Sequence, residues 1–300
     1  MAQTVLVTGA GGFVGRAVVR LLAASSGVRV VALGGPMLDG VRTLEGRLHD
    51  LKPHTWTDAG ITHIDSAIHL AAFTPKDQQD EDPERCYRDN LLGTQRLIES
   101  LSAVTRFVHV STLDVYRPPS ANQMINEDSP VSPRSLYAAS KLLSEVAVQL
   151  HSKQSGMEHC VVRLGHVYGP GEERYRKLIP EAIRHLRAGR PVPIMGGGTT
   201  ERDLLFVDDA AEALRRVALR DTCPVGPINV VSGRSHTVRE IVDRLIGVAQ
   251  KGEIAIIHTP TSAAVSLRFD NRRMLNALGT WTLVDLNEGL RREWAEVQGP

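Results

Sequence analysis

Short apolar segments alternate along the chain with longer segments in which apolar residues recur every three or four positions. The apolar segments of the first half are 4–8, 28–33, 66–72, 106–112 and 159–165. Near-continuous apolar runs of this length are typical of parallel strands buried on both faces, and the amphipathic segments between them are typical of helices. The pattern therefore predicts an α/β protein built on a Rossmann-type, doubly wound parallel sheet.

The alternation changes beyond residue 170. A basic amphipathic helix is expected over 172–189, because two prolines follow its closing glycine. Residues 208–219 and 226–231 predict one more helix and one more strand of the sheet. Two further helices, over 237–250 and 285–297, predict a smaller mixed α/β lobe at the C-terminal end.

Composition excludes several classes of partner. The 300 residues carry a formal net charge of +1, so neither nucleic acid nor a membrane is an expected partner. No apolar run approaches the roughly 20 residues of a membrane helix. Cys86, Cys160 and Cys223 show no CxxC pairing, and no HxxxH spacing occurs, so neither disulfides nor a metal site is expected. A glycine-rich segment starting at residue 9 leaves no room for a removable leader, and a cytoplasmic location is expected.

Three glycines, Gly9, Gly12 and Gly15, stand between the first strand and the first helix in GAGGFVG. Gly9 permits a tight turn, Gly12 lets the backbone approach a pyrophosphate, and Gly15 lets the helix pack closely on the strand. The N–H groups and the positive dipole end of that helix then face the phosphates, which predicts a dinucleotide-binding domain. The expected division assigns residues 1–169 and about 203–232 to that domain, and residues 170–202 and 233–300 to a substrate-binding lobe.

The preference between NAD and NADP stays open at this level. An acidic residue at the end of the second strand normally holds the ribose 2′-hydroxyl of NAD. The sequence VVALGGP has Gly34 at that position. An NADP site needs a cation nearby, which Arg42 or Arg47 is able to supply, although both are equally compatible with solvated surface arginines.

Tyr137 and Lys141 stand four residues apart in LYAASKLLSEV and so share one helix face. The ordinary pKa of a phenol, about 10, is too high for a base at neutral pH. A nearby lysine cation, together with an oxidised nicotinamide ring, is expected to lower it, so that Tyr137 takes a proton from a substrate hydroxyl. Upstream, Ser111 and Thr112 end a strand, where hydroxyls are placed to polarise a substrate oxygen.

Five motifs follow one another in a fixed order: TGAGGFVG, HLAA, DNLLGT, STLDVY and YAASK. The series resembles the extended short-chain dehydrogenase/reductase family, and within it the NAD-dependent epimerase/dehydratase branch that works on nucleotide sugars. The resemblance continues through VVRLGHVYGPG, ERDLLFVDDAAEA and PINVVSGRSHTVREI, and so covers almost the whole chain.

The resemblance implies roles for individual residues. Tyr137 is the expected base, Lys141 its partner on the nicotinamide ribose, and Thr112 the hydroxyl that bonds the reacting sugar oxygen. It also implies a homodimer formed through two long helices. The expected cofactor-binding residues are Gly9, Gly12, Phe13, Val14, Gly15, Gly34, Leu48, Leu70, Ala71, Ala72, Asn90, Val110, Tyr137, Lys141, Leu164, His166 and Val167. The expected substrate-binding residues are Thr74, Ser111, Thr112, Asp114, His166 and Arg202, the last against the phosphates unless it pairs with Glu201 or Asp203.

Departures from the family pattern narrow the range of expected reactions and substrates. In sugar-nucleotide 4,6-dehydratases an Asp-Glu pair follows the threonine, whereas this chain has Leu113 and Asp114, so dehydration is not expected. His166 replaces an asparagine, and Arg47 stands where relatives carry an aspartate directed toward the adenine ring. Arg268 is the nearest replacement for a late arginine. The first hypothesis is an NAD(P)-dependent epimerase of a nucleotide-linked sugar. The alternatives are a net nucleotide-keto-sugar reductase in the same fold and a non-catalytic, dinucleotide-responsive regulator.

Overall fold

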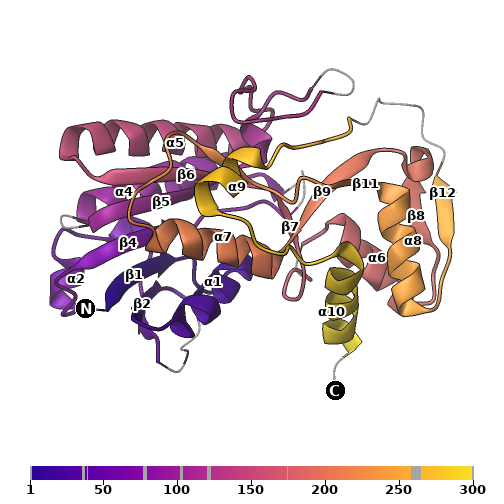
Figure 1. Ribbon diagram of the computed structural model, residues 1–300, viewed down its shortest axis with the longest axis horizontal. Helices are drawn as coiled ribbons and strands as arrows, with labels where there is room; N and C mark the ends of the chain where they lie inside the picture. The colour runs from indigo at the N-terminus through magenta and orange to yellow at the C-terminus, as the bar shows by residue number, and fades with distance from the viewer. Residues whose placement is uncertain are drawn as a thin grey trace.

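The fold is built around a seven-stranded parallel sheet flanked by helices (Figure 1), which confirms the predicted Rossmann-type α/β class. The computed structural model describes residues 2–35, 38, 40–76, 80–101, 104–119, 123–173, 175–257 and 265–298. In spatial order the strands are β10 (Ile228–Val230), β6 (Glu158–Leu164), β5 (Val104–Thr112), β4 (Ile64–His69), β1 (Gln3–Thr8), β2 (Val28–Leu33) and β3 (Arg42–Leu44).

The central strand β1 explains why the sheet has two cores. Val5, Leu6 and Val7 are fully buried, because β1 lies between β2 and β4 and is covered on both faces. Side chains alternate along a strand, so Val5 and Val7 join one apolar cluster and Leu6 joins the other. All the strands run in one direction, and their carboxyl ends therefore meet at one edge of the sheet.

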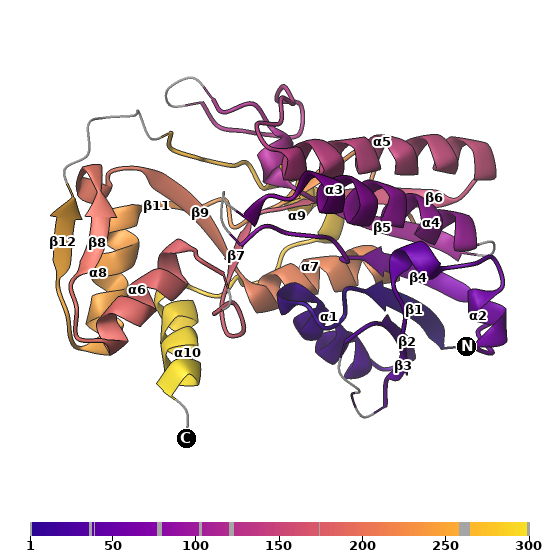
Figure 2. The same cartoon turned by 180° about the vertical axis from the view of Figure 1, so that it is seen from behind.

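Helices cover the two faces separately, as Figures 1 and 2 show. One face carries α1 (Phe13–Ala23) and α7 (Val207–Leu219), which pack on each other. The other carries α4 (Gly93–Ser100), the π-helix η3 (Cys86–Leu92) and α5 (Leu136–Ser155). Shorter elements complete this part: η1 (Leu48–Asp50), α2 (Thr55–Asp58), α3 (Pro83–Arg85), η4 (Leu113–Val115) and α9 (Arg272–Leu278).

Local signals fix the two ends of α5, the longest helix. The Ser135 hydroxyl accepts a hydrogen bond from the backbone N–H of Ala138 at 3.1 Å and caps the first turn. Gly156 ends the helix in the left-handed conformation, with φ of +77°. Because α5 lies beside β5 and β6, its first turn stands at the carboxyl edge of the sheet.

A smaller group of elements lies to one side of the large sheet (Figure 1). Contrary to the prediction of a helix from residue 172, α6 begins only at Leu178, and residues 169–173 and 175–177 form a loop with turns from Gly169 to Glu172 and from Glu172 to Tyr175. The elements of this group are β7 (His166–Tyr168), α6 (Leu178–Arg187), β8 (Val192–Met195), η5 (Gly196–Gly198), β9 (Glu201–Phe206), β11 (Ser235–Thr237), α8 (Val238–Ala249), β12 (Ile254–Ile257) and α10 (Leu286–Gln298). Among the described residues, no helix is long and apolar enough to cross a membrane.

Candidate active site

The glycine turn between β1 and α1 leaves room for backbone only. Gly9 has φ of +69°, and a Cβ atom built on it would lie 2.7 Å from the backbone nitrogen of Ala71. A Cβ atom on Gly15 would collide with the carbonyl oxygen of Gly9. The Gly12 N–H donates to that same carbonyl at 2.9 Å and closes the turn. This geometry fits a ligand phosphate held against bare backbone at the start of α1.

A cavity of about 1240 Å³ opens in front of this turn and runs along the carboxyl edge of the sheet. It brings together most of the residues that the sequence predicted for cofactor and substrate. The predicted residues that line it are Gly9, Gly12, Phe13, Val14, Gly15, Leu70, Ala71, Ala72, Thr74, Val110, Ser111, Thr112, Asp114, Tyr137, Lys141, Leu164, His166, Val167 and Arg202.

Three predicted cofactor residues, Gly34, Leu48 and Asn90, do not line this cavity. Gly34 follows β2, and Leu48 lines a smaller cavity described below. The buried Asn90 amide is used within the protein: it accepts from the Phe73 N–H at 2.7 Å and donates to the Phe73 carbonyl and to Ser140 Oγ. Asn90 therefore ties the loop after β4 to α5.

Tyr137 and Lys141 lie on the first two turns of α5 and face the cavity. Lys141 is only 2% exposed, and burial lowers its pKa to about 8, against the opposing charge of Glu145. Burial and the Asp114 carboxylate raise the pKa of Tyr137, while hydrogen bonds with Thr74 and Thr112 oppose that shift. In the chain by itself, desolvation is the main cause that holds the phenol pKa above its ordinary value. The predicted lowering involves the nicotinamide as well as Lys141, and it stays a prediction.

The two hydroxyls at the end of β5 have different partners. Ser111 donates its hydrogen to Glu145, which also forms a buried ion pair with Arg163 at 2.8 Å. Because its hydroxyl hydrogen is used in this bond, Ser111 is not free to donate to a substrate oxygen. Thr112 is more accessible: its hydroxyl donates to Asp114 Oδ2 and accepts from the Asp114 N–H, both at 3.2 Å. Thr112 thus links Tyr137 to an exposed carboxylate.

Sequence reasoning missed several residues of this cavity. Glu81 accepts the backbone N–H of Tyr137 at 2.8 Å and so helps to hold the start of α5. It lies in a polar loop 56 residues upstream, where no local pattern marks it. The other unpredicted lining residues are Pro75, Leu113, Arg134, Ser135, Gly165, Tyr175, Arg176 and Lys177.

Cations, among them Lys177 and Arg202, also line the cavity. Arg202 donates to the backbone carbonyl of Glu201, whose carboxylate pairs instead with Arg268. Asp203 accepts from the residues around Ser232, so the alternative that Arg202 is neutralised by a neighbouring acid is wrong. Burial lowers the pKa of His166, and Lys177 and Arg202 add to that shift against Asp114.

Two buried carboxyl groups lie behind the loop that carries Lys177. Glu172 of the loop and Glu293 of α10 are each 1% exposed, and each has one oxygen without a hydrogen bond among the described residues. Burial raises the pKa of Glu172 to about 7, against the Lys177 ammonium 3.7 Å away. Burial and the neighbouring Glu172 raise the pKa of Glu293 to about 10. The pair therefore shares at least one proton at neutral pH.

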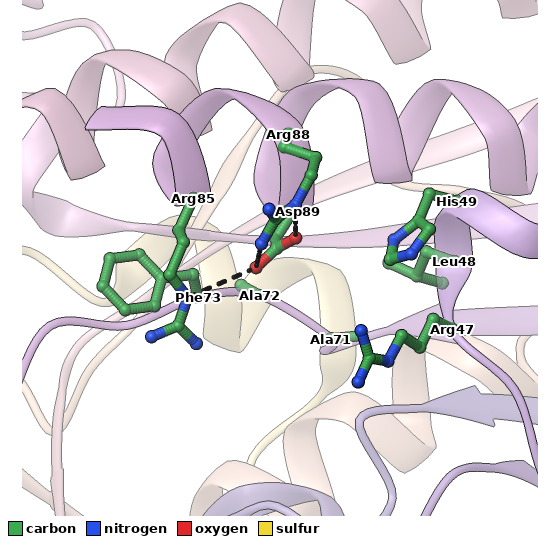
Figure 3. A pocket seen from close by; sticks show the side chains of 9 residues that line it. All are labelled: Arg47, Leu48, His49, Ala71, Ala72, Phe73, Arg85, Arg88 and Asp89. Atoms are coloured by element: carbon green, nitrogen blue, oxygen red, sulfur yellow. Dashed lines mark hydrogen bonds and ion pairs between the residues drawn. The ribbon is translucent and has the colours of Figure 1, made fainter. Parts of the chain in front are cut away.

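A second cavity, of about 420 Å³, adjoins the first at Ala71 and Ala72 (Figure 3). Its walls combine apolar side chains with three arginines. The lining residues are Arg47, Leu48, His49, Ala71, Ala72, Phe73, Arg85, Arg88 and Asp89. In the described part of the chain, no cluster of histidine, cysteine or acidic residues is arranged to hold a metal ion.

Comparison with known proteins identifies the family. The model of the NAD dependent epimerase/dehydratase family matches residues 5–231, and the chain belongs to this family. Its relatives include a dTDP-glucose 4,6-dehydratase from Streptomyces griseus, 31% identical over 97% of this chain and 92% of the relative. They also include a UDP-glucose 4-epimerase from Mycolicibacterium smegmatis, 31% identical over 96% of both chains. The chain is therefore related to NAD-dependent enzymes that act on nucleotide sugars.

Solved structures agree with this assignment. MoeE5 in complex with UDP-glucose and NAD superposes with a TM-score of 0.81 at 30% identity, covering 98% of both chains. The UDP-glucose 4-epimerase of Thermotoga maritima, at 23% identity and a TM-score of 0.87 over 99% of both chains, shares the fold.

Proposed function

We propose that this protein is an NAD(P)-dependent epimerase of a nucleotide-linked sugar. The observation that carries the proposal is the gathering of Thr112, Tyr137 and Lys141 on one cavity that begins at the glycine turn. The turn would hold the pyrophosphate of the dinucleotide against the start of α1. When bound, the oxidised nicotinamide would supply the hydride acceptor and a positive charge beside the phenol.

The chain's own residues would then transfer one proton from the sugar and back to it. Thr112 and Tyr137 would hold a ring hydroxyl of the sugar, and Tyr137 would take its proton as the carbon is oxidised. Lys141, with a pKa lowered to about 8 by burial, remains mostly cationic at pH 7 and would orient the cofactor ribose. The same phenol would return the proton once the keto-sugar has presented its other face.

Leu113 favours epimerisation over dehydration. Elimination of water from a sugar needs an acid for the leaving hydroxyl as well as a base for the neighbouring carbon. The residue after Thr112 is leucine, which transfers no proton, and it lies buried against Val231 and other apolar side chains. This departure separates the chain from the 4,6-dehydratase chemistry named for its Streptomyces griseus relative.

A net ketoreductase is the second candidate, and one contact favours it. Tyr137 hydrogen bonds to Thr112, and Thr112 donates to the exposed Asp114. A reductase must draw a new proton from solvent in every turnover, whereas an epimerase returns the proton it took. The hydroxyl-to-carboxylate chain provides such a route.

The cations that line the cavity support a substrate with a diphosphate. Lys177, which directly precedes α6, and Arg202 of β9 both line the cavity. Two cations of this kind suit the diphosphate of a sugar nucleotide, whose sugar would then reach Tyr137.

We also propose a homodimer through α5. Leu143, Val146 and Leu150 recur on one face of this helix and are 46%, 44% and 54% exposed. Leu92 of the adjacent η3 is 51% exposed. An apolar stripe on two neighbouring helices is the surface that a second copy would cover.

The experiment that tests the function starts with substrates. UDP-, dTDP- and GDP-sugars are incubated with NAD or NADP, and products are separated by chromatography with mass detection. Epimerisation gives an isomer of unchanged mass without net cofactor use, whereas reduction consumes NADPH or NADH stoichiometrically.

Tyr137→Phe is the decisive variant. It should lower turnover by about 10³-fold or more, while cofactor affinity changes less than threefold, because only the phenol oxygen is removed. Asp208→Asn, which removes an exposed carboxylate on α7, is the control. Turnover that survives Tyr137→Phe would contradict the proposal.

A further inference from the structure

Among the described residues that directly follow β2, Gly34 and Gly35 carry no charge that could select a ribose hydroxyl. Gly34, directly after the strand, has φ of +73°, and a Cβ atom built on it would meet nothing within 4 Å. Its N–H donates to the carbonyl of Leu44, the last residue of β3, at 2.9 Å. The chain that follows β3, including Arg47, therefore begins beside Gly34 at the same edge of the sheet.

The structure separates the two arginines that the sequence left as candidates. The Arg42 guanidinium donates to the carbonyl of Ala59 and lies against Gly60, so its donors point away from both cavities. The Arg47 side chain lines the smaller cavity (Figure 3) and makes no hydrogen bond or ion pair with the described residues, whereas its backbone carbonyl accepts from the Asp50 N–H. Arg47 thus has five donors available to a ligand.

The other charges of the smaller cavity are already committed. Asp89, its only acidic lining residue, lies 2.9 Å from Arg88 Nε and 3.7 Å from Arg85 Nε. Arg85 also stacks over the Phe73 ring, 4.0 Å from the ring centroid. No lining carboxylate therefore competes for Arg47, and the field on that side of the cavity is positive.

The position of this cavity connects it to the glycine turn. Ala71 and Ala72 line both cavities, and Gly9 packs against Ala71. A dinucleotide whose pyrophosphate lies on the turn would extend its adenosine past these alanines. Leu48 with the two alanines offers apolar surface for a purine ring, and Arg47, which lies between β3 and Leu48 in the chain, lines the same cavity.

From these contacts we infer that the protein prefers a dinucleotide with a phosphorylated ribose, NADP, and that Arg47 binds its 2′-phosphate. The inference rests on the proposed function and specifies its cofactor. An arginine fork pairs with a phosphate in a bidentate manner, and the missing acid at Gly34 removes the repulsion that a phosphate would otherwise meet. The chain would differ in this respect from MoeE5, whose structure holds NAD.

The test compares two small ligands that differ only in the 2′-phosphate: 2′,5′-ADP and 5′-AMP. Their dissociation constants, and those of NADP and NAD, are measured by calorimetry on the wild type, on Arg47→Gln and on Arg42→Gln. The wild type should bind the 2′-phosphorylated member of each pair at least tenfold more tightly, and added salt should reduce that ratio. Arg47→Gln should remove most of the ratio with little effect on 5′-AMP, and Arg42→Gln should retain it.

Two results overturn the inference alone: NAD bound as tightly as NADP, or Arg47→Gln weakening both members of each pair equally. If neither NAD nor NADP binds the wild type, the proposed function fails together with the inference. Because the wild-type ratio is decisive by itself, a variant that fails to fold leaves the test intact. Arg47→Lys then reports whether charge alone, without the fork, sustains part of the preference.

Discussion

The buried carboxyl pair between Glu172 and Glu293 makes a quantitative prediction about stability and pH. Both pKa values are raised above the ordinary value of 4.5, so the folded chain holds protons that the unfolded chain has released. Stability is therefore full below about pH 4.5 and falls as pH rises through the window to about 7 for Glu172 and to about 10 for Glu293.

The size of the effect follows from the shift. Raising the pKa of Glu172 to about 7 corresponds to roughly 3 kcal/mol of lost stability above pH 7, at about 1.4 kcal/mol per pKa unit. Glu293 imposes a cost of at least similar size at pH 8, because it must stay protonated. Glu293→Gln removes the second acid and offers an amide donor to the Glu172 carboxylate.

The assay is thermal unfolding of the wild type and Glu293→Gln at pH 5 and pH 8. A gain of about 3 kcal/mol at pH 8 corresponds to a rise in Tm of roughly 6 °C for a chain of this size. At pH 5 the gain should fall below about 1 kcal/mol, because this pH lies only slightly above the ordinary pKa of 4.5 at which the unfolded chain releases these protons. Glu296→Gln, an exposed acid on the same helix, is the matched control. An equal rise at both pH values, or a lower Tm at pH 8, would refute the reasoning.

Three further changes test other features. Lys141→Met should abolish turnover yet raise Tm by several degrees at pH 7. The buried cation, with its pKa lowered to about 8, costs roughly 3 kcal/mol of folding stability below that pH. A lower Tm would contradict this reasoning. Leu143→Glu should give monomers in light scattering, whereas Ser155→Glu, an exposed position on the opposite face of α5, should not; dimers in both would exclude this surface. Gly34→Asp should weaken NADP binding at least tenfold relative to Gly34→Asn, which has the same shape and φ strain without the charge; equal affinities would show that this position does not face the ribose.

The order of elements was largely predictable because the signals are local. The apolar strands are visible as short runs because both faces of the sheet are covered, as for Val5 to Val7 of β1. The glycine turn was visible because a Cβ atom on Gly9 or Gly15 would meet backbone, and only glycine satisfies that constraint. The Tyr137–Lys141 spacing places both side chains on one helix face whatever surrounds them.

The features that could not be predicted from the sequence depend on contacts between distant segments. Glu81 reaches Tyr137 across 56 residues, and Ser111 loses its free hydroxyl to Glu145 on a different element. The pKa of Tyr137 depends on burial, which no local spacing encodes. The amphipathic pattern after residue 170 predicted a helix from residue 172, yet turns at Glu172 precede α6, which begins only at Leu178.

The three hydrogen bonds of Asn90 have a consequence for protein engineering. Its side-chain amide joins the loop at Phe73 to α5 at Ser140, and the backbone carbonyl of Asn90 also accepts from Ser144. Transplanting α5 alone into another scaffold would leave the Ser140 and Ser144 hydroxyls buried without their hydrogen-bond partner Asn90. A chimera that keeps its chemistry should therefore exchange the loop after β4, η3 and α5 as one cassette.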